Sequence, residues 1–161
     1  MRIAIVADTH MPRGPRELPE RCLEELRDAE LIVHAGDFSE ISVLERLRSL
    51  APVVAVHGNV DSAELRRELP ESTSFEAGSA TVAVVHDAGP RKGRLERLRA
   101  RFADADAVVF GHSHMPLHEE RDGFQIFNPG SPTERRRAPT KTMGIAEAEG
   151  GRIRFRHLEL G

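Results

Sequence analysis

The chain has 161 residues, enough for one domain with a core of its own, and its 23 Lys and Arg residues against 26 Asp and Glu residues leave a formal net charge of -3. A hydrophobic content of 39% with 30% charged residues is ordinary for a globular protein and excludes disordered and collagen-like chains. We therefore expect a single domain over residues 1–161.

Cysteine usage and apolar run length exclude several other classes of protein. Cys22 is the only cysteine, so an intramolecular disulfide and a cysteine-rich zinc site are both excluded. No apolar run approaches the roughly 18 to 20 residues that cross a membrane, and residues 1–7 lack the features of an export signal, which predicts a cytoplasmic protein. The small, mixed charge and the absence of Tyr and Trp give no strong sign of a nucleic-acid partner.

Short apolar runs rich in β-branched residues recur along the first two thirds of the chain, and each ends in a polar cluster. Runs of this length between turn residues are typical of strands, and their continuous hydrophobicity indicates that both faces are covered. The predicted strands are 3–7, 31–35, 53–56, 81–85 and 107–110.

Leucine-rich stripes at helical spacing lie between these runs, around residues 18–26, 41–50 and 95–102. Strands that alternate with helices predict an α/β fold, in which ligands gather at the carboxyl ends of the strands. After residue 114 the pattern changes to short strands joined by Gly-containing turns, which predicts an antiparallel tail. The tail strands are 117–120, 124–128, 143–149 and 153–159, and the Pro- and Arg-rich segment 131–142 is predicted to be a loop.

The polar residues at the strand ends form a set of metal ligands without a thiolate. Carboxylates, imidazoles and one amide suit borderline divalent ions such as Mn, Fe, Co, Ni or Zn, whereas Mg²⁺ and Ca²⁺ favour oxygen alone. The set is large enough for two ions, and a carboxylate shared by two ions is an arrangement that binds a hydroxide and phosphoryl oxygens. The candidate ligands are Asp8, His10, Asp37, Asn59, His86, His112 and His114.

Five motifs, in this order and each after a predicted strand, resemble those of the calcineurin-like metallophosphoesterase superfamily. The short chain, the Asn128-Pro129-Gly130-Ser131 segment and the small C-terminal strands resemble its compact prokaryotic phosphodiesterase branch. The five motifs are Asp8-x-His10, Gly36-Asp37, Gly58-Asn59, His86 and Gly111-His112-Ser113-His114.

The resemblance implies a fold of two mixed β-sheets packed face to face and flanked by helices, in four αββα layers. It also implies two divalent metal ions, with Mn expected first and Fe, Ni, Co and Zn as alternatives. The first ion would be held by Asp8, His10, Asp37 and His114. The second would be held by Asp37, Asn59, His86 and His112, so that Asp37 bridges the two ions.

A site of this kind implies a phosphodiesterase in which a metal-bridging hydroxide attacks the phosphorus of a small phosphodiester, with Asp37, Asn59 and His86 as catalytic residues. Val60 stands where many relatives have a His that is thought to assist the leaving group, and Asp87 stands where they commonly have Gly. A phosphomonoesterase and a nuclease with the same site are alternatives. A protein-binding scaffold, the role of a eukaryotic membrane-coat subunit with this architecture, is a third, and a small homo-oligomer is compatible with the branch.

The remaining candidates have simpler structural interpretations. We expect His34 and His57 to be hydrogen-bonded at strand ends, His118 and His157 to be solvated strand residues, and Cys22 to be a small core residue. The run Arg135, Arg136 and Arg137 is either a solvated face or a clamp for a substrate phosphate. By resemblance, Asn128 and Ser131 would lie near the site.

Overall fold

The apolar runs predicted from the sequence become strands of two separate sheets in the computed structural model, which describes all 161 residues. In the first sheet β1 (Arg2–Val6), β2 (Leu31–His34) and β3 (Val53–Ala55) run parallel. On the other side of β1, β9 (Thr142–Glu149) pairs antiparallel to it, and β10 (Arg152–Glu159) pairs antiparallel to β9. The sheet order is therefore β10-β9-β1-β2-β3.

The second sheet also has five strands, in the order β4-β5-β6-β8-β7. Its centre is parallel and consists of β5 (Ala80–Val85), β6 (Ala107–Val109) and β8 (Phe124–Asn128). The antiparallel edges are β4 (Ser72–Ala77) and β7 (Leu117–Arg121). Because β8 runs parallel to β6, the prediction of a wholly antiparallel tail is wrong at this strand.

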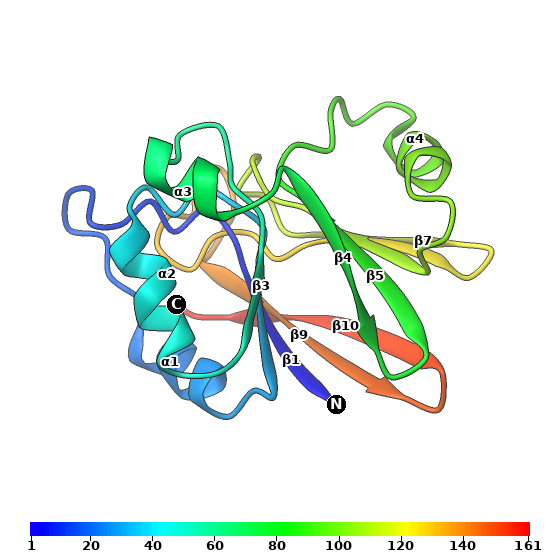
Figure 1. Ribbon diagram of the computed structural model, residues 1–161, viewed down its shortest axis with the longest axis horizontal. Coiled ribbons are helices and arrows are strands. Elements are labelled where there is room, and N and C mark those ends of the chain that lie inside the picture. The colour runs from blue at the N-terminus through cyan, green and yellow to red at the C-terminus, as the bar shows by residue number, and fades with distance from the viewer.

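The helices cover the outer faces of the two sheets (Figure 1). Buried side chains of α1 (Glu20–Arg27), α2 (Ile41–Arg48) and α3 (Ala63–Glu68) pack on the first sheet in one core cluster. Those of α4 (Arg94–Arg101) pack on the second sheet in another. This arrangement confirms the predicted four-layer fold of two mixed sheets between helices, and none of the four helices has the length and apolar composition that a membrane crossing requires.

Strand β1 shows why the sequence has continuous apolar runs. Ile3 and Ile5 point into the core between the two sheets, whereas Ala4 and Val6 point into the core beneath the helices. Successive side chains of a strand point to opposite faces, so a strand between two apolar layers needs hydrophobic residues at every position.

Two elements have no clear signal in the sequence. Helix α3 buries only Leu65, and so shows no apolar stripe. Strand β4 is an edge strand with several accessible residues and a polar composition. Both belong to the segment between Asn59 and β5, which sequence analysis left unassigned.

The residues that sequence analysis placed outside the metal site lie as predicted, with one exception. His34 is fully buried, with Nε2 3.1 Å from Thr9 Oγ1, and Cys22 is buried on α1, where burial raises the pKa of its thiol to about 12. His118 is exposed. The prediction that His157 is solvated is wrong, because β10 faces the second sheet and the His157 ring stacks on Phe127 with centroids 4.4 Å apart.

A candidate metal centre at the strand ends

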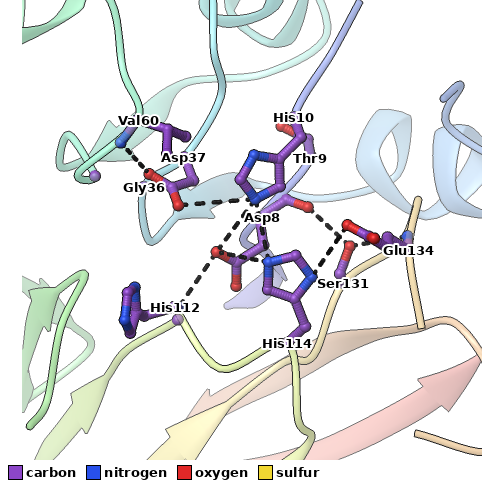
Figure 2. Close-up of polar contacts among 12 residues, drawn as sticks. Asp8, Thr9, His10, Gly36, Asp37, Val60, His112, His114, Ser131 and Glu134 are labelled. Carbon is purple, nitrogen blue, oxygen red and sulfur yellow. Dashed lines mark hydrogen bonds and ion pairs between the residues drawn. The ribbon is translucent and has the colours of Figure 1, made fainter. Parts of the chain in front are cut away.

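All seven predicted ligands lie together at the carboxyl ends of strands from both sheets. Parallel strands end at the same edge of a sheet, and the two stacked sheets place these edges next to each other. Figure 2 shows several of the side chains converging from different segments of the chain. The contributing strands are β1, β2 and β3 of the first sheet and β5 and β6 of the second.

Asp8, His10 and His114 form a first group of buried ligand atoms that all lie within 4.8 Å of one another. The Nε2 atoms of His10 and His114 are 3.1 Å apart. Asp8 Oδ1 is 3.6 Å from His114 Nε2 and 3.9 Å from His10 Nε2. Three ligand atoms from two distant parts of the chain thus face one small volume (Figure 2).

Asp37, His86 and His112 form a second group with ligand atoms within the same 4.8 Å limit. Asp37 Oδ2 is 3.1 Å from His86 Nε2. Asn59 Oδ1 is 3.1 Å from both His86 Nε2 and His112 Nδ1, so the amide belongs to this group. His112 is exposed, which leaves the second group open to solvent on one side.

Asp37 lies between the two groups. Its Oδ2 atom is 3.7 Å from His10 Nε2 in the first group and 3.1 Å from His86 Nε2 in the second. Its other oxygen accepts a hydrogen bond from the Val60 backbone N–H at 3.1 Å. The carboxylate is therefore in reach of both groups, as a shared ligand would need to be.

One unpaired atom of the first group, an oxygen of Asp8, fits a cation. Asp8 Oδ2 is buried and has no hydrogen-bond partner, and burial raises the pKa of this carboxyl to about 7. Burial, with the charges of Arg136 and His10, lowers the pKa of His114 to about 4, so its imidazole is neutral. The neutral imidazole is the form that binds a divalent metal ion, and a bound ion would favour the ionised form of the Asp8 carboxyl.

In the second group the charges already favour a carboxylate. Burial opposes ionisation of Asp37, but its hydrogen bond with His86 and the charge of that ring lower its pKa to about 2. The same contact raises the pKa of His86 against the effect of burial. The donor set of carboxylates, imidazoles and an amide fits a borderline divalent ion at both groups.

Five of the candidate ligands have a strained backbone. Their φ angles lie between 47° and 73°, in the left-handed region that costs a non-glycine residue roughly 1–2 kcal/mol. Strain of this kind persists at functional sites where the surrounding structure enforces it. The residues are Asp8, His10, Asp37, His112 and His114.

The glycines of the motifs are explained by close approach of the loops. A Cβ on Gly58 would lie 2.0 Å from Asp37 Oδ1, and one on Gly36 would lie 2.7 Å from His86 Nδ1. Glycine at these positions therefore lets the backbone pass directly behind the ligands.

Sequence analysis missed Asp61, a buried carboxylate that organises the loops of the second group. Its Oδ2 accepts hydrogen bonds from the backbone N–H groups of Gly58 at 2.7 Å and Asp37 at 3.0 Å, and its Oδ1 accepts one from Ser39 at 2.8 Å. Its position two residues after Asn59 was the available signal, since Asp side chains often bond nearby backbone N–H groups.

Asn128 and Ser131 brace the site, in agreement with their expected position near it. Asn128 Nδ2 donates to Gly111 O at 3.0 Å, and Ser131 Oγ donates to Asp8 O at 2.8 Å. Thr133, which sequence analysis missed, donates from Oγ1 to Thr9 O at 2.8 Å. Segment 131–142 is a loop, as predicted, until β9 begins at Thr142.

The arginine run divides into two parts. Arg135 donates to Ala138 O within its own loop at 3.2 Å. Arg136 and Arg137 line a cavity of about 570 Å³ with Ser113 and Met115, next to the histidine motif. Arg136 and Arg137 therefore border this cavity, whereas Arg135 is not part of its lining.

A second cavity, of about 360 Å³, borders the second ligand group. Its lining includes Asn59 and His86 together with His57, Arg66 and Asp87. His57 is partly buried at the end of β3, with Nδ1 3.4 Å from Gly58 O. The Asp87 side chain is turned to its own loop and accepts a hydrogen bond from the Gly89 N–H at 2.8 Å.

A two-sheet α/β fold with carboxylates and imidazoles clustered at its strand ends places the chain among the metallophosphoesterases. Residues 1–151 match the model of the calcineurin-like phosphoesterase superfamily domain, and the chain belongs to this family. It is 38% identical to a probable metallophosphoesterase of Methanothermobacter thermautotrophicus over 135 residues, which are 83% of this chain and 78% of that protein.

A second curated protein and a solved structure are also similar to the chain. A phosphodiesterase of Methanocaldococcus jannaschii is 27% identical over 146 residues, which cover 81% of this chain and 83% of the relative. A crystal structure of a single mutant of Vps29 from Entamoeba histolytica superposes with a TM-score of 0.80 at 21% identity and covers 100% of both chains. The second likeness shows that the whole chain adopts this fold.

Proposed function

We propose that the protein is a metal-dependent phosphodiesterase with two metal ions. The observation that carries this proposal is the position of Asp37, whose Oδ2 atom is within 3.7 Å of a ligand nitrogen in each of two adjacent ligand groups. The name of the related phosphodiesterase of Methanocaldococcus jannaschii supports a diester as substrate.

Each ligand would serve the ion nearest to it, with Asp37 shared between them. Mn²⁺ is the ion we propose, with Fe, Ni, Co and Zn as alternatives that the same donors accept. When bound, such ions provide a water of lowered pKa and neutralise charge on the phosphoryl oxygens. The first ion would be held by Asp8, His10, Asp37 and His114. The second would be held by Asp37, Asn59, His86 and His112.

The side chains of the second group are already oriented for this role. His86 Nδ1 donates to the backbone carbonyl of Ala35 at 2.7 Å, so Nε2, beside Asp37 and Asn59, is the nitrogen that would bind an ion once its proton is released. Asn59 presents its oxygen to the two imidazoles, so its amide N–H groups are free to donate to a phosphoryl oxygen.

The chain offers no acid at the position where many relatives have a histidine. Val60 occupies it and is 40% exposed. Leaving groups that depart without protonation would therefore be the most reactive. The cavity of about 360 Å³ that borders the second group and the one of about 570 Å³ at Ser113 of the histidine motif are of the size that binds small ligands. Their size supports a small phosphodiester.

The first experiment is hydrolysis of bis(p-nitrophenyl) phosphate by chelator-stripped protein, without metal and with Mn²⁺ or each of the four alternative ions. The matching monoester and single- and double-stranded DNA are tested beside the diester. We expect turnover that needs the metal and favours the diester. A preference for the monoester would identify a phosphomonoesterase, and cleavage of single- or double-stranded DNA would identify a nuclease. A folded protein that is inactive with all five ions would instead support the non-catalytic scaffold.

Replacement Asp37→Asn tests the shared ligand. We expect metal content to fall at both groups and turnover to drop by more than about 100-fold, because even changes outside the ligand set cost roughly 10- to 100-fold. A variant with full metal content and undiminished rate would contradict the role of Asp37.

A further inference from the structure

The two nitrogens of His114 have very different surroundings. Nε2 faces Asp8 and His10 in the first ligand group, at 3.6 Å and 3.1 Å. Nδ1 is buried and has no hydrogen-bond partner. In the second group the corresponding nitrogen of His86 is satisfied by the backbone carbonyl of Ala35. A metal-binding histidine normally donates its other N–H to an oxygen, so the free Nδ1 of His114 requires an acceptor.

Glu134 supplies a carboxylate at this position. Its Oε2 atom is 3.6 Å from His114 Nδ1, a few tenths of an ångström beyond hydrogen-bond distance (Figure 2). A small rotation of either side chain would close this gap.

Two arginines also hold the Glu134 carboxylate. Arg16 Nη2 is 3.2 Å from the same Oε2 atom, and Arg136 Nε is 4.0 Å from it. The backbone of Glu134 is fixed as well, because its N–H donates to Ser131 Oγ at 3.1 Å, and that hydroxyl donates to Asp8 O. The Glu134 backbone is therefore tied to the segment that carries Asp8, the first ligand of the group.

We propose that Glu134 is a positioning residue that accepts the Nδ1 proton of His114 in a hydrogen bond and is itself held by Arg16. This inference rests on the proposed two-metal site. The bond fixes the tautomer in which the Nε2 lone pair faces Asp8 and His10, and the negative charge increases the basicity of that nitrogen. In the first group a side chain, Glu134, would then orient the histidine ring of His114. In the second group a backbone carbonyl, that of Ala35, orients the ring of His86.

The test measures metal binding rather than activity. Chelator-stripped protein is titrated with Mn²⁺ by calorimetry, and Co²⁺ absorption reports the ligand geometry. In Glu134→Ala we expect the affinity of one of the two binding steps to fall about 10- to 100-fold while the other step stays unchanged. Glu134→Gln keeps an oxygen acceptor without the charge, so its loss should be smaller.

Two further variants separate positioning from a general effect on folding. Glu20→Gln removes the carboxylate of another Arg–Glu pair, formed with Arg27 at 3.0 Å on α1, and should leave both binding steps unchanged. Arg16→Gln should weaken the same step as Glu134→Ala, and it should have no added effect when combined with that variant. Unfolding temperatures of the metal-free variants check that each one folds.

The outcomes distinguish this inference from the proposed function. Two binding steps in the wild type that are unchanged in Glu134→Ala would overturn the role of Glu134 and leave the phosphodiesterase proposal intact. A wild-type protein that binds no divalent ion would overturn both.

Discussion

At the scale of the residue, a buried group outside the set of candidate ligands supports the loops of the site. Asp61 is 6% exposed and accepts three backbone hydrogen bonds, from Asp37, Ser39 and Gly58. Hydrogen bonds to a charged group contribute about 1.5–3 kcal/mol each, and a buried donor left without a partner is costly.

We expect Asp61→Ala to lower the free energy of unfolding of the metal-free protein by about 3 kcal/mol or more, because three backbone donors lose their acceptor. Urea denaturation in the presence of chelator measures this directly. Asp104→Ala, at an exposed position, is the matched control and should stay within about 0.5 kcal/mol of wild type. Equal stability of the two variants would show that Asp61 does not organise these loops.

The two parts of the arginine run have different predicted roles. Arg137 lines the cavity beside the histidine motif. We expect Arg137→Ala to raise the KM for a diester with an anionic arm by roughly 3- to 10-fold with little change in kcat. The reason is that a contact between the guanidinium and this arm would be equally strong in the bound substrate and in the transition state. Arg135, which bonds its own loop, provides the control, because Arg135→Ala should leave KM unchanged. If both variants behave alike, the cavity does not bind the substrate arm.

At the scale of the element, the turn between β3 and α3 is the part of the site with least room. Gly58 lies in this turn with Asp37 Oδ1 only 2.0 Å from where a Cβ would be. The turn at Gly58 and the loop after β2, which carries Asp37, therefore constrain each other's conformation.

We expect Gly58→Ala to weaken metal binding at both groups, because the new methyl group displaces the Asp37 carboxylate that lies between them. Gly78→Ala in the turn between β4 and β5 meets no atom within 4 Å and pays only for its φ of 65°, roughly 1–2 kcal/mol of stability. Metal titration of both variants gives the comparison. Wild-type metal affinity in Gly58→Ala would contradict this view of the turn.

At the scale of the whole molecule, the ligand cluster joins the two sheets. Asp8, Asp37 and Asn59 follow strands of the first sheet, whereas His86, His112 and His114 follow strands of the second. Ions held by both sets would bind the native protein and not the unfolded chain, and so would stabilise the fold.

Thermal unfolding is therefore expected to depend on the metal. At a free Mn²⁺ concentration of about 100 times Kd, binding at one site adds about 2.7 kcal/mol. For a protein of this size we expect the unfolding midpoint to rise by roughly 5 to 10 °C. Excess chelator should return the midpoint to that of the metal-free protein, whereas a midpoint that does not respond to Mn²⁺ would contradict binding across the sheets.

The sequence alone predicted the strands that precede the candidate ligands, and it singled out as one set the residues that the structure brings together. Runs such as 3–7 and 107–110 are apolar at every position because both faces of their strands are covered, and polar residues follow each run at the point where it leaves the core. This information is local, so it is readable without coordinates. The resemblance to the calcineurin-like family, confirmed by the family match over residues 1–151, supplied the two-sheet arrangement.

Only the tertiary structure decided how distant segments meet. It divided the strands after residue 114 between the two sheets. Strand β8 pairs parallel to β6 in the second sheet, whereas β9 and β10 belong to the first. It also placed Glu134 beside His114 and Asp61 beneath the loop of Asp37, and it packed His157 against Phe127. These contacts depend on the packing of strands far apart in the chain, and neither hydrophobic periodicity nor turn chemistry contains that information.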